Sequence, residues 1–332
     1  MSEVTVLGAG GWGIALALAA REAGNRVSVW SCFQTEVDEL KKHREHKKLL
    51  PGVKIPDDIE ITSDINCAEN SDITIIAVPS TVVRQTAARL KNIQCGIVVN
   101  VAKGLENKTQ ETLDKVIRDE LPDRRIVILS GPSHAEEVGR QVPTTLVSAS
   151  EDIEAAEEVQ RIMMSKFLRI YTNTDVVGVE LGGALKNVIA VAAGVIDGLG
   201  HGDNTKAALI TRGIAEISRL GVKMGADKDT FVGLSGLGDL IVTCSSEHSR
   251  NHRFGVKLGK GEDPKTALEE VGTVEGYYAA EVIHDMSQKY NLEMPICEQC
   301  YEVIYKGKSP AQAVYDLMTR PKKDEQDNIL WI

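Results

Sequence analysis

Lys186 interrupts an otherwise apolar helical pattern that runs from Leu181 to Ala190. A lysine in such a setting is costly unless a partner compensates its charge. Burial and cationic neighbours lower the pKa of a lysine, which suits it to act as a general acid or base near neutral pH. The alternative is a lysine whose long stem carries its ammonium group to the surface. The helical pattern by itself leaves both interpretations open.

Two later segments offer polar groups that suit such a lysine and an anionic substrate. The glycine-rich loop 234–240 presents one carboxylate, Asp239, which can orient a lysine or simply cap a helix. Ser249, Arg250 and Asn251 then offer a hydroxyl, a guanidinium and an amide in succession, a set that suits phosphate oxygens. An exposed loop without a ligand can have the same composition, so the motif is a hypothesis.

In the first half of the chain, polar segments directly follow predicted strands. They are Pro79-Ser80, the stretch 101–104 and the stretch 130–135. Because ligands of open α/β sheets gather at the carboxyl ends of the strands, these segments are candidate binding sites. Lys103, beside Gly104, can meet an anionic ligand as a point charge, although a solvated loop lysine has the same sequence.

The pattern G-x-G-x-x-G occurs at Gly8, Gly10 and Gly13. It comes directly after an apolar strand pattern at Val4–Leu7 and opens a helical pattern that ends at Gly24. In such loops the first glycine permits a tight turn, the second lets a pyrophosphate approach the backbone, and the third allows close packing of helix and strand. This context predicts dinucleotide binding, against a glycine-rich turn that serves packing only.

The residues after the second strand pattern leave the choice between NAD and NADP open. An acidic residue at the tip of that strand would hold the adenosine ribose of NAD. Here Ser31-Cys32-Phe33-Gln34 stands at the tip, and Glu36 comes later. No arginine stands at the tip to meet a 2′-phosphate either.

The elements that must position these groups alternate in the first half and are helical in the second. Short β-branched runs separated by amphipathic stretches predict a Rossmann-type, doubly wound and mostly parallel sheet. The predicted strands are Val4–Leu7, Arg26–Trp30, Ile73–Val78, Ile97–Asn100, Ile126–Leu129, Thr145–Ser148 and Leu168–Tyr171. The charged stretch His43–Pro56 breaks this rhythm and predicts a loop excursion.

From Asp175 onward the strand signals fade, and Asp263-Pro264 and Ser309-Pro310 mark helix starts. We therefore expect a dinucleotide-binding domain at residues 1–173 and an all-helical substrate-binding and catalytic domain at 174–332. Docking of the apolar end of the tail, Leu330–Ile332, onto the body stays open.

The composition is that of a packed globular protein. At ~150 residues per domain, 332 residues correspond to about two domains, and 26% charged with 42% hydrophobic residues argues against a disordered or fibrous chain. A net charge of −10 predicts no nucleic-acid partner. The apolar stretch Val188–Ile196 is too short to span a bilayer, and Ile14–Ala20 lacks the basic flank of a signal peptide. We expect a cytoplasmic protein without membrane insertion.

Metal and redox sites are weakly indicated. Six cysteines are too sparse for a disulfide scaffold and fit a reducing compartment. Cys297 and Cys300 form a C-x-x-C pattern, but a structural zinc needs four ligands and no second C-x-x-C exists. His248 and His252 lack a nearby acidic third ligand. We expect no metal and interpret the two cysteines as ordinary helix residues.

Taken together and in order, the motifs resemble one family along nearly the whole chain. The matching stretches are Gly8–Gly13, His43–Glu45 with Leu50–Gly52, Ala77–Ser80, Ala102–Glu106, Gly131–Ala135, Glu180–Asn187, Gly236–Leu240 and Ser249–Asn251. This order is similar to that of bacterial NAD(P)-dependent glycerol-3-phosphate dehydrogenase. The resemblance implies reversible, NAD(P)-linked interconversion of sn-glycerol 3-phosphate and dihydroxyacetone phosphate, which supplies glycerol 3-phosphate for phospholipid synthesis, and it implies a homodimer.

The resemblance also implies roles for particular residues. Lys186 would give and take the proton of the substrate oxygen, with Lys103 and Asp239 as its companions in catalysis. The implied substrate ligands are Lys103, Gly131, Ser133, Lys186, Asn187, Asp239, Thr243, Ser249, Arg250 and Asn251. The implied cofactor contacts are Gly8, Gly10, Gly11, Trp12, Gly13, Lys103, Ala135, Arg250, Thr273 and Glu275.

One departure and two alternatives accompany the resemblance. Members of the family often carry a basic residue just after the second strand, where this chain has Cys32-Phe33, although Arg250 could supply a contact to a 2′-phosphate. A β-hydroxyacid dehydrogenase also joins a Rossmann domain to a helical domain with a lysine, and it would bind a carboxylate in place of a phosphate. A cofactor-binding sensor without turnover is the other alternative, because the acid that specifies adenosine ribose is missing.

Overall fold

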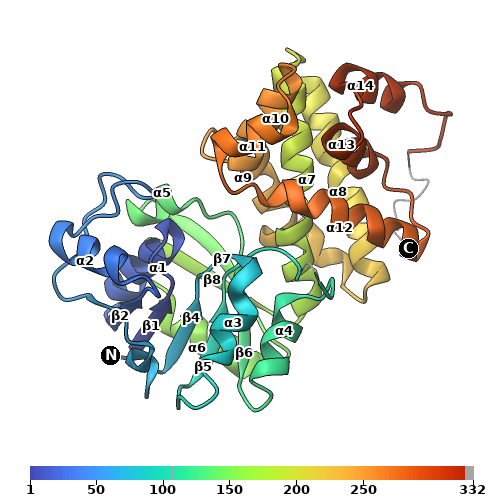
Figure 1. Ribbon diagram of the computed structural model, residues 1–332. Coiled ribbons are helices and arrows are strands. Elements are labelled where there is room, and N and C mark those ends of the chain that lie inside the picture. Colours follow the sequence, from blue (N-terminus) through green and yellow to red (C-terminus); the bar gives the residue numbers. More distant parts are fainter. Residues whose placement is uncertain (107, 326–332) are drawn as a thin grey trace. The chain divides into compact units, whose positions relative to one another are not determined.

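The structure is a computed structural model that describes residues 1–106 and 108–325. It divides into two compact units, Met1–Val176 and Val177–Ile332 (Figure 1). The division falls close to the boundary expected at residues 173 and 174. The apolar end of the tail, residues 330–332, lies outside the described residues.

Among the described residues of the first unit, eight strands form one sheet in the order β3-β2-β1-β4-β5-β6-β7-β8. They are β1 (Glu3–Leu7), β2 (Arg26–Trp30), β3 (Glu60–Thr62), β4 (Ile73–Ile76), β5 (Ile97–Asn100), β6 (Ile126–Ser130), β7 (Thr144–Ala149) and β8 (Leu168–Asn173). Neighbouring strands run parallel except for the antiparallel pair β6 and β7. The expected doubly wound and mostly parallel sheet is confirmed.

One observed strand was not predicted, and several predicted strands differ from the observed ones by one or two residues at an end. The short strand β3 was missed because it has only one buried apolar residue, Ile61, between two polar ones. The strand expected at Ile73–Val78 ends earlier, at Ile76. Ile76 pairs with Leu7, the last residue of β1, so the chain beyond this point has no partner strand and turns away.

Helices cover both faces of the sheet because alternate residues of each buried strand point to opposite faces. Val4 and Val6 join one apolar cluster with α1 (Gly11–Glu22), α2 (Gln34–His43) and α6 (Ile153–Met163). Leu7 joins the opposite cluster with α3 (Val83–Ala88) and α4 (Leu113–Glu120), and Figure 1 shows these last two helices together on one side. The carboxyl ends of the strands thereby stay accessible at one edge.

The regular elements among the described residues of the second unit are all helices, as expected. Its helices are α7 (Val176–Gly198), α8 (Asp203–Lys223), α9 (Asp239–Ser245), α10 (Arg250–Gly259), α11 (Pro264–Val271), α12 (Glu275–Tyr290), α13 (Pro295–Tyr305) and α14 (Pro310–Met318). Asp263 and Ser309 cap α11 and α14 as the sequence predicts. By length and composition α7 could cross a membrane, but its apolar segment is wholly buried inside the protein.

A buried carboxylate on α8 caps another helix of this unit. Glu216 accepts hydrogen bonds from the backbone N–H groups of Ile296 and Cys297 at the first turn of α13. These bonds satisfy donors that have no partner within their own helix. Burial nevertheless raises the pKa of Glu216 to about 7, because the charged carboxylate loses its hydration.

Candidate active site

The glycine loop after β1 has the geometry of a phosphate-binding turn. Gly8 has a φ of +124°, which favours glycine, and its N–H donates to the carbonyl of Trp30 at 2.8 Å. A Cβ atom at Gly8 would lie 2.5 Å from the carbonyl oxygen of Ala77, and one at Gly13 would lie 1.9 Å from the carbonyl oxygen of Gly8. Both positions therefore exclude any side chain.

Gly10 behaves differently from the other two glycines of the motif. A Cβ atom there would meet only the side chain of Leu49, at 4.0 Å. The open space above Gly10 and the free N–H groups at the start of α1 suit an approaching pyrophosphate. The next residue, Gly11, packs against the backbone of Leu49, and Trp12 packs against the apolar cluster. The loop fits a dinucleotide.

Three residues implied as substrate ligands lie together in the segments that follow β5 and β6. The Nζ atom of Lys103 donates to the carbonyl oxygen of Gly131 at 3.1 Å, and the hydroxyl of Ser133 donates to the same oxygen at 2.9 Å. Lys103 follows β5 and Gly131 follows β6, so two neighbouring strands place them. Ala135, implied as a cofactor contact, begins α5 (Ala135–Gly139) just beyond Ser133.

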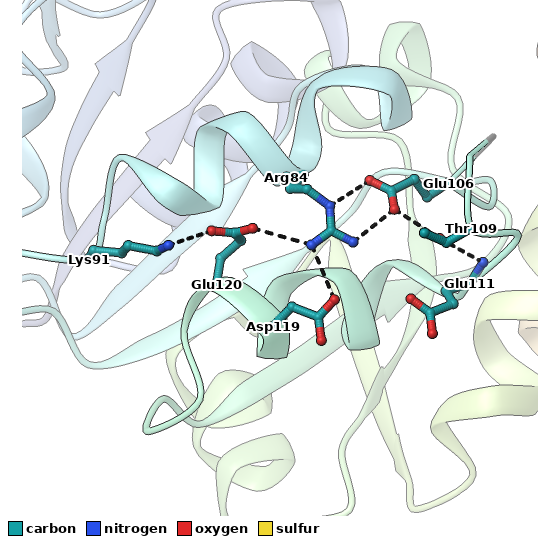
Figure 2. A network of polar contacts seen from close by, with 7 residues as sticks. All are labelled: Arg84, Lys91, Glu106, Thr109, Glu111, Asp119 and Glu120. Carbon is teal, nitrogen blue, oxygen red and sulfur yellow. Dashed lines mark hydrogen bonds and ion pairs between the residues drawn. The ribbon is translucent and has the colours of Figure 1, made fainter.

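An ion-pair network holds the segment that carries Lys103 (Figure 2). Arg84 on α3 donates two hydrogen bonds to Glu106, at 2.7 and 2.8 Å. The same guanidinium also reaches Asp119 at 3.1 Å and Glu120 at 3.2 Å on α4, as Figure 2 shows. Beside Arg84 the pKa of Glu106 lies below its ordinary value. The network could not be predicted from the sequence, because its partners are distant in the chain.

In the second unit, Lys186 is buried, with 4% of its surface exposed. The interpretation of a lysine that reaches the surface is therefore wrong. Its ammonium group donates to the carboxylate of Asp239 and to the hydroxyl of Thr243, the latter at 2.6 Å. Thr243 in turn donates to the backbone carbonyl of Asp239 at 2.6 Å. A buried, oriented ammonium of this kind can exchange a proton with a bound substrate.

Close backbone packing brings Asp239 to Lys186. A one-turn π-helix, Leu234–Gly238, leads directly into α9 and its first residue Asp239. A Cβ atom at Gly182, one turn before Lys186, would lie 2.7 Å from the carbonyl oxygen of Ser235. The glycine thus lets the π-helix lie against α7. Thr243, which the resemblance implies as a substrate ligand, follows Asp239 by one helical turn, so both side chains lie on one face of α9.

A continuous chain of hydrogen bonds links three further candidates. The N–H of Gly276 donates to Oδ1 of Asn251 at 2.8 Å, and Nδ2 of Asn251 donates to Oδ1 of Asn187 at 2.9 Å. Nδ2 of Asn187 then donates to the carboxylate of Glu275 at 2.9 Å. Each bond fixes the orientation of the next amide. Thr273, implied as a cofactor contact, lies exposed before this cluster.

Ser249 and Arg250 form the start of α10. The buried hydroxyl of Ser249 accepts from the N–H of His252 at 3.2 Å and caps the helix, while Arg250 is exposed. Nε2 of His252 lies 2.7 Å from Asp197 on α7. A guanidinium beside free N–H groups at a helix N-terminus suits phosphate oxygens.

Paired glycines set the position of α10 against α7. Gly255 would place a Cβ atom 2.0 Å from the carbonyl oxygen of Val191, and Gly194 would place one 2.0 Å from that of His252. Only helices without side chains at these positions can approach so closely. The crossing holds Asn251 against Asn187.

The cysteine and histidine patterns are not arranged as metal or redox sites. Cys297 and Cys300 are buried, and burial raises the pKa of Cys297 well above its ordinary value and that of Cys300 to about 12. Such thiols are poor nucleophiles. Within residues 1–106 and 108–325, no group of three or more His, Cys, Asp or Glu side chains could hold a metal ion.

Comparisons with known proteins show the family to which the chain is similar. Models described as NAD-dependent glycerol-3-phosphate dehydrogenase N-terminus and C-terminus match residues 3–156 and 175–315. A protein of Desulfitobacterium hafniense (strain Y51) named glycerol-3-phosphate dehydrogenase, NAD(P)+, is 50% identical over 100% of this chain and 95% of its own length. Its namesake from Fusobacterium nucleatum is 50% identical over 98% and 99%.

A solved structure shows the same arrangement of elements. The crystal structure of glycerol-3-phosphate dehydrogenase from Coxiella burnetii matches with a TM-score of 0.91 at 36% identity, over 96% of this chain and 99% of that one. Full-length identity near one half, together with both family models, decides the assignment. The chain therefore belongs to the NAD-dependent glycerol-3-phosphate dehydrogenase family.

Proposed function

We propose that this protein reversibly interconverts sn-glycerol 3-phosphate and dihydroxyacetone phosphate with NAD(H) or NADP(H). The observation that carries the proposal is the buried ammonium of Lys186, held by Asp239 and Thr243. A ketone can be reduced only if the developing alkoxide receives a proton, and an oriented ammonium supplies one.

Different side chains of the protein have different roles in the reaction. The bound nicotinamide supplies or accepts the hydride. In the reducing direction Lys186 gives a proton from Nζ to the substrate oxygen, and in the oxidising direction it takes that proton back. Asp239 and Thr243 orient the ammonium, and the carboxylate stabilises its positive charge.

Binding of the phosphate group would orient the substrate at a distance from the reacting carbon. In the second unit Ser249, Arg250 and Asn251 supply a helix N-terminus, a guanidinium and an amide for this task. In the first unit Lys103 adds a positive charge beside Gly131 and Ser133. Binding the phosphate away from the reacting carbon aids catalysis, because the binding energy of the phosphate offsets the free-energy cost of ordering the reacting groups.

The cofactor is assigned to the glycine loop and to residues that follow other elements. Gly8, Gly10, Gly11, Trp12 and Gly13 would receive the pyrophosphate and its neighbouring groups. The further cofactor contacts that we propose are Lys103, Ala135, Arg250, Thr273 and Glu275.

Membership of the family supports three finer statements. We propose that the product glycerol 3-phosphate supplies phospholipid synthesis, that the enzyme is cytoplasmic, and that it acts as a homodimer. Size-exclusion chromatography with light scattering tests the last statement, since a monomer would elute with about half the expected mass.

The activity is tested by the absorbance of the reduced nicotinamide when purified protein is mixed with dihydroxyacetone phosphate and NADH, and again with NADPH. Rapid oxidation of either cofactor supports the proposal. Folded protein that binds the cofactor and oxidises it only with a β-ketoacid would be a β-hydroxyacid dehydrogenase. Protein that binds the cofactor and turns over neither substrate would be a sensor, and replacement of Lys186 would then leave its function intact.

A further inference from the structure

No acidic residue stands directly after β2 in the sequence, but α2, the next helix, brings a carboxylate to this place. Ser31 is the residue after Trp30, at the tip of β2, and its hydroxyl donates a hydrogen bond to the carboxylate of Glu36 in the first turn of α2. The N–H of Phe33 donates to the Ser31 hydroxyl at 3.2 Å, which tightens the turn. Glu36 is thereby folded back to the tip of the strand.

The tip of β2 and the excursion at residues 43–56 both adjoin the glycine loop. Trp30 accepts from the N–H of Gly8 at 2.8 Å, which joins the tip of β2 to the start of the loop. Leu49 in the excursion lies against Gly10 and Gly11. In dinucleotide-binding folds this position meets the adenosine ribose.

His46 connects Glu36 to the excursion. Nδ1 of His46 accepts from the N–H of Leu49 at 3.2 Å, so its other nitrogen carries the proton that faces Glu36, at 3.4 Å. The hydrogen bond from His46, and to a smaller degree that from Ser31, keeps the pKa of Glu36 below its ordinary value despite partial burial. The carboxylate is therefore charged at neutral pH and stays in place.

Several cations of the same excursion are engaged elsewhere. Arg44 donates to the carbonyl oxygens of Pro56 and Ile59 at 3.2 and 2.9 Å, and Lys54 pairs with Glu45 at 2.6 Å. Lys47 and Lys48 are exposed beyond His46. The tip of β2 itself presents Cys32 and Phe33, the latter 64% exposed, which suits an adenine ring better than a phosphate.

We propose that Glu36, oriented by the hydrogen bond from the buried Ser31, recognises the 2′-hydroxyl of the adenosine ribose and makes this enzyme prefer NADH to NADPH. The charged carboxylate accepts a hydrogen bond from a ribose hydroxyl and repels a 2′-phosphate at the same place. The inference rests on the proposed function and names the cofactor that the sequence leaves open.

The ratio of kcat/KM for NADH to that for NADPH, with dihydroxyacetone phosphate as substrate, measures the preference. A hydrogen bond to a charged group is worth about ten- to hundredfold in affinity, so we expect a ratio of at least ~10. Glu36→Gln should lower this ratio about tenfold, chiefly through KM for the cofactors, with KM for dihydroxyacetone phosphate unchanged. Asp38→Asn, on the same helix but bound to Gln34, is the matched control and should keep the ratio.

Binding measured without substrate separates this inference from the proposed activity. Titration with ADP-ribose and with its 2′-phosphorylated form should show tighter binding of the first, and Glu36→Gln should reduce the difference even if no turnover occurs. Equal or better use of NADPH by the unaltered enzyme would overturn the inference while leaving the dehydrogenase activity standing. So would a large rise in KM for NADPH in Lys48→Gln, because a cation would then hold the 2′-phosphate. An unchanged ratio in Glu36→Gln, with folding verified by thermal denaturation, would also overturn it.

Discussion

Replacing Lys186 by methionine should abolish turnover and also weaken the fold, and the two effects can be separated. Lys186 and Asp239 are 4% and 1% exposed, and they share a hydrogen bond. Removing one member of a buried ion pair costs about 3–5 kcal/mol in the free energy of unfolding. Loss of a general acid reduces kcat by about 10²–10⁴-fold.

The double variant Lys186→Met with Asp239→Asn resolves the ambiguity. When both charges are removed, no carboxylate is left without its ammonium, and replacement of a buried pair by neutral groups is often nearly neutral for stability. We therefore expect the double variant to recover most of the lost unfolding free energy in urea titrations. Its kcat should stay as low as that of the single variant, because the proton donor is still missing.

The assay is oxidation of the reduced nicotinamide by dihydroxyacetone phosphate, with kcat and KM determined for each variant. Lys257→Met serves as a control, since it removes an ammonium from ion pairs with Glu262 and Glu270 near the surface of the same unit. It should leave kcat unchanged. If Lys186→Met keeps more than about a tenth of the activity, or the double variant regains activity along with stability, Lys186 does not move the proton.

Three further predictions concern other parts of the molecule. Burial raises the pKa of Glu216 from an ordinary 4.5 to about 7, so its contribution to the free energy of unfolding is complete at low pH, and ~3 kcal/mol of it is lost as the pH rises from about 4.5 through 7. Urea titrations at several pH values should show this fall in the free energy of unfolding, and Glu216→Gln should remove it. Gly13→Ala should destabilise the protein by at least about 1–3 kcal/mol, because its Cβ atom clashes with the backbone of Gly8. Gly10→Ala should keep the melting temperature of the unaltered protein and weaken NADH binding. Equal melting temperatures for the two variants would contradict the packing argument. Glu106→Gln should lower kcat/KM for dihydroxyacetone phosphate about tenfold by loosening the Lys103 segment, and unchanged kinetics would show that the network in Figure 2 does not position it.

Local patterns predicted most of the first unit. β5 begins with a continuous apolar run and β2 has valines at alternate positions, so both strands were predicted at their observed bounds. The glycine motif was equally clear, because the backbone conformation of Gly8 and the close contact of Gly13 exclude other residues. The short strand β3 carries too few apolar residues to be distinguished from a loop.

The candidate residues were also visible in the sequence, but their partners were not. Lys186 stood out as a charge in an apolar helix, yet only the structure shows it buried and bound to Asp239 and Thr243. Glu36 comes after the residues at the tip of β2 and was therefore not predicted to bind the adenosine ribose, yet its hydrogen bond with Ser31 brings the carboxylate back to this tip.

The class of fold, the cofactor loop and the family could all be predicted from the amino-acid sequence, because they depend on local periodicity, on backbone conformations open only to glycine, and on the order of the motifs. The pairing of charges, as with Arg84 and Glu106, and the alignment of amides, as with Asn187 and Asn251, became visible in the three-dimensional structure alone. Such contacts join residues far apart in the chain through packing. The free energy of a charge depends on its burial and its neighbours, and the neighbours exist only once the chain has folded.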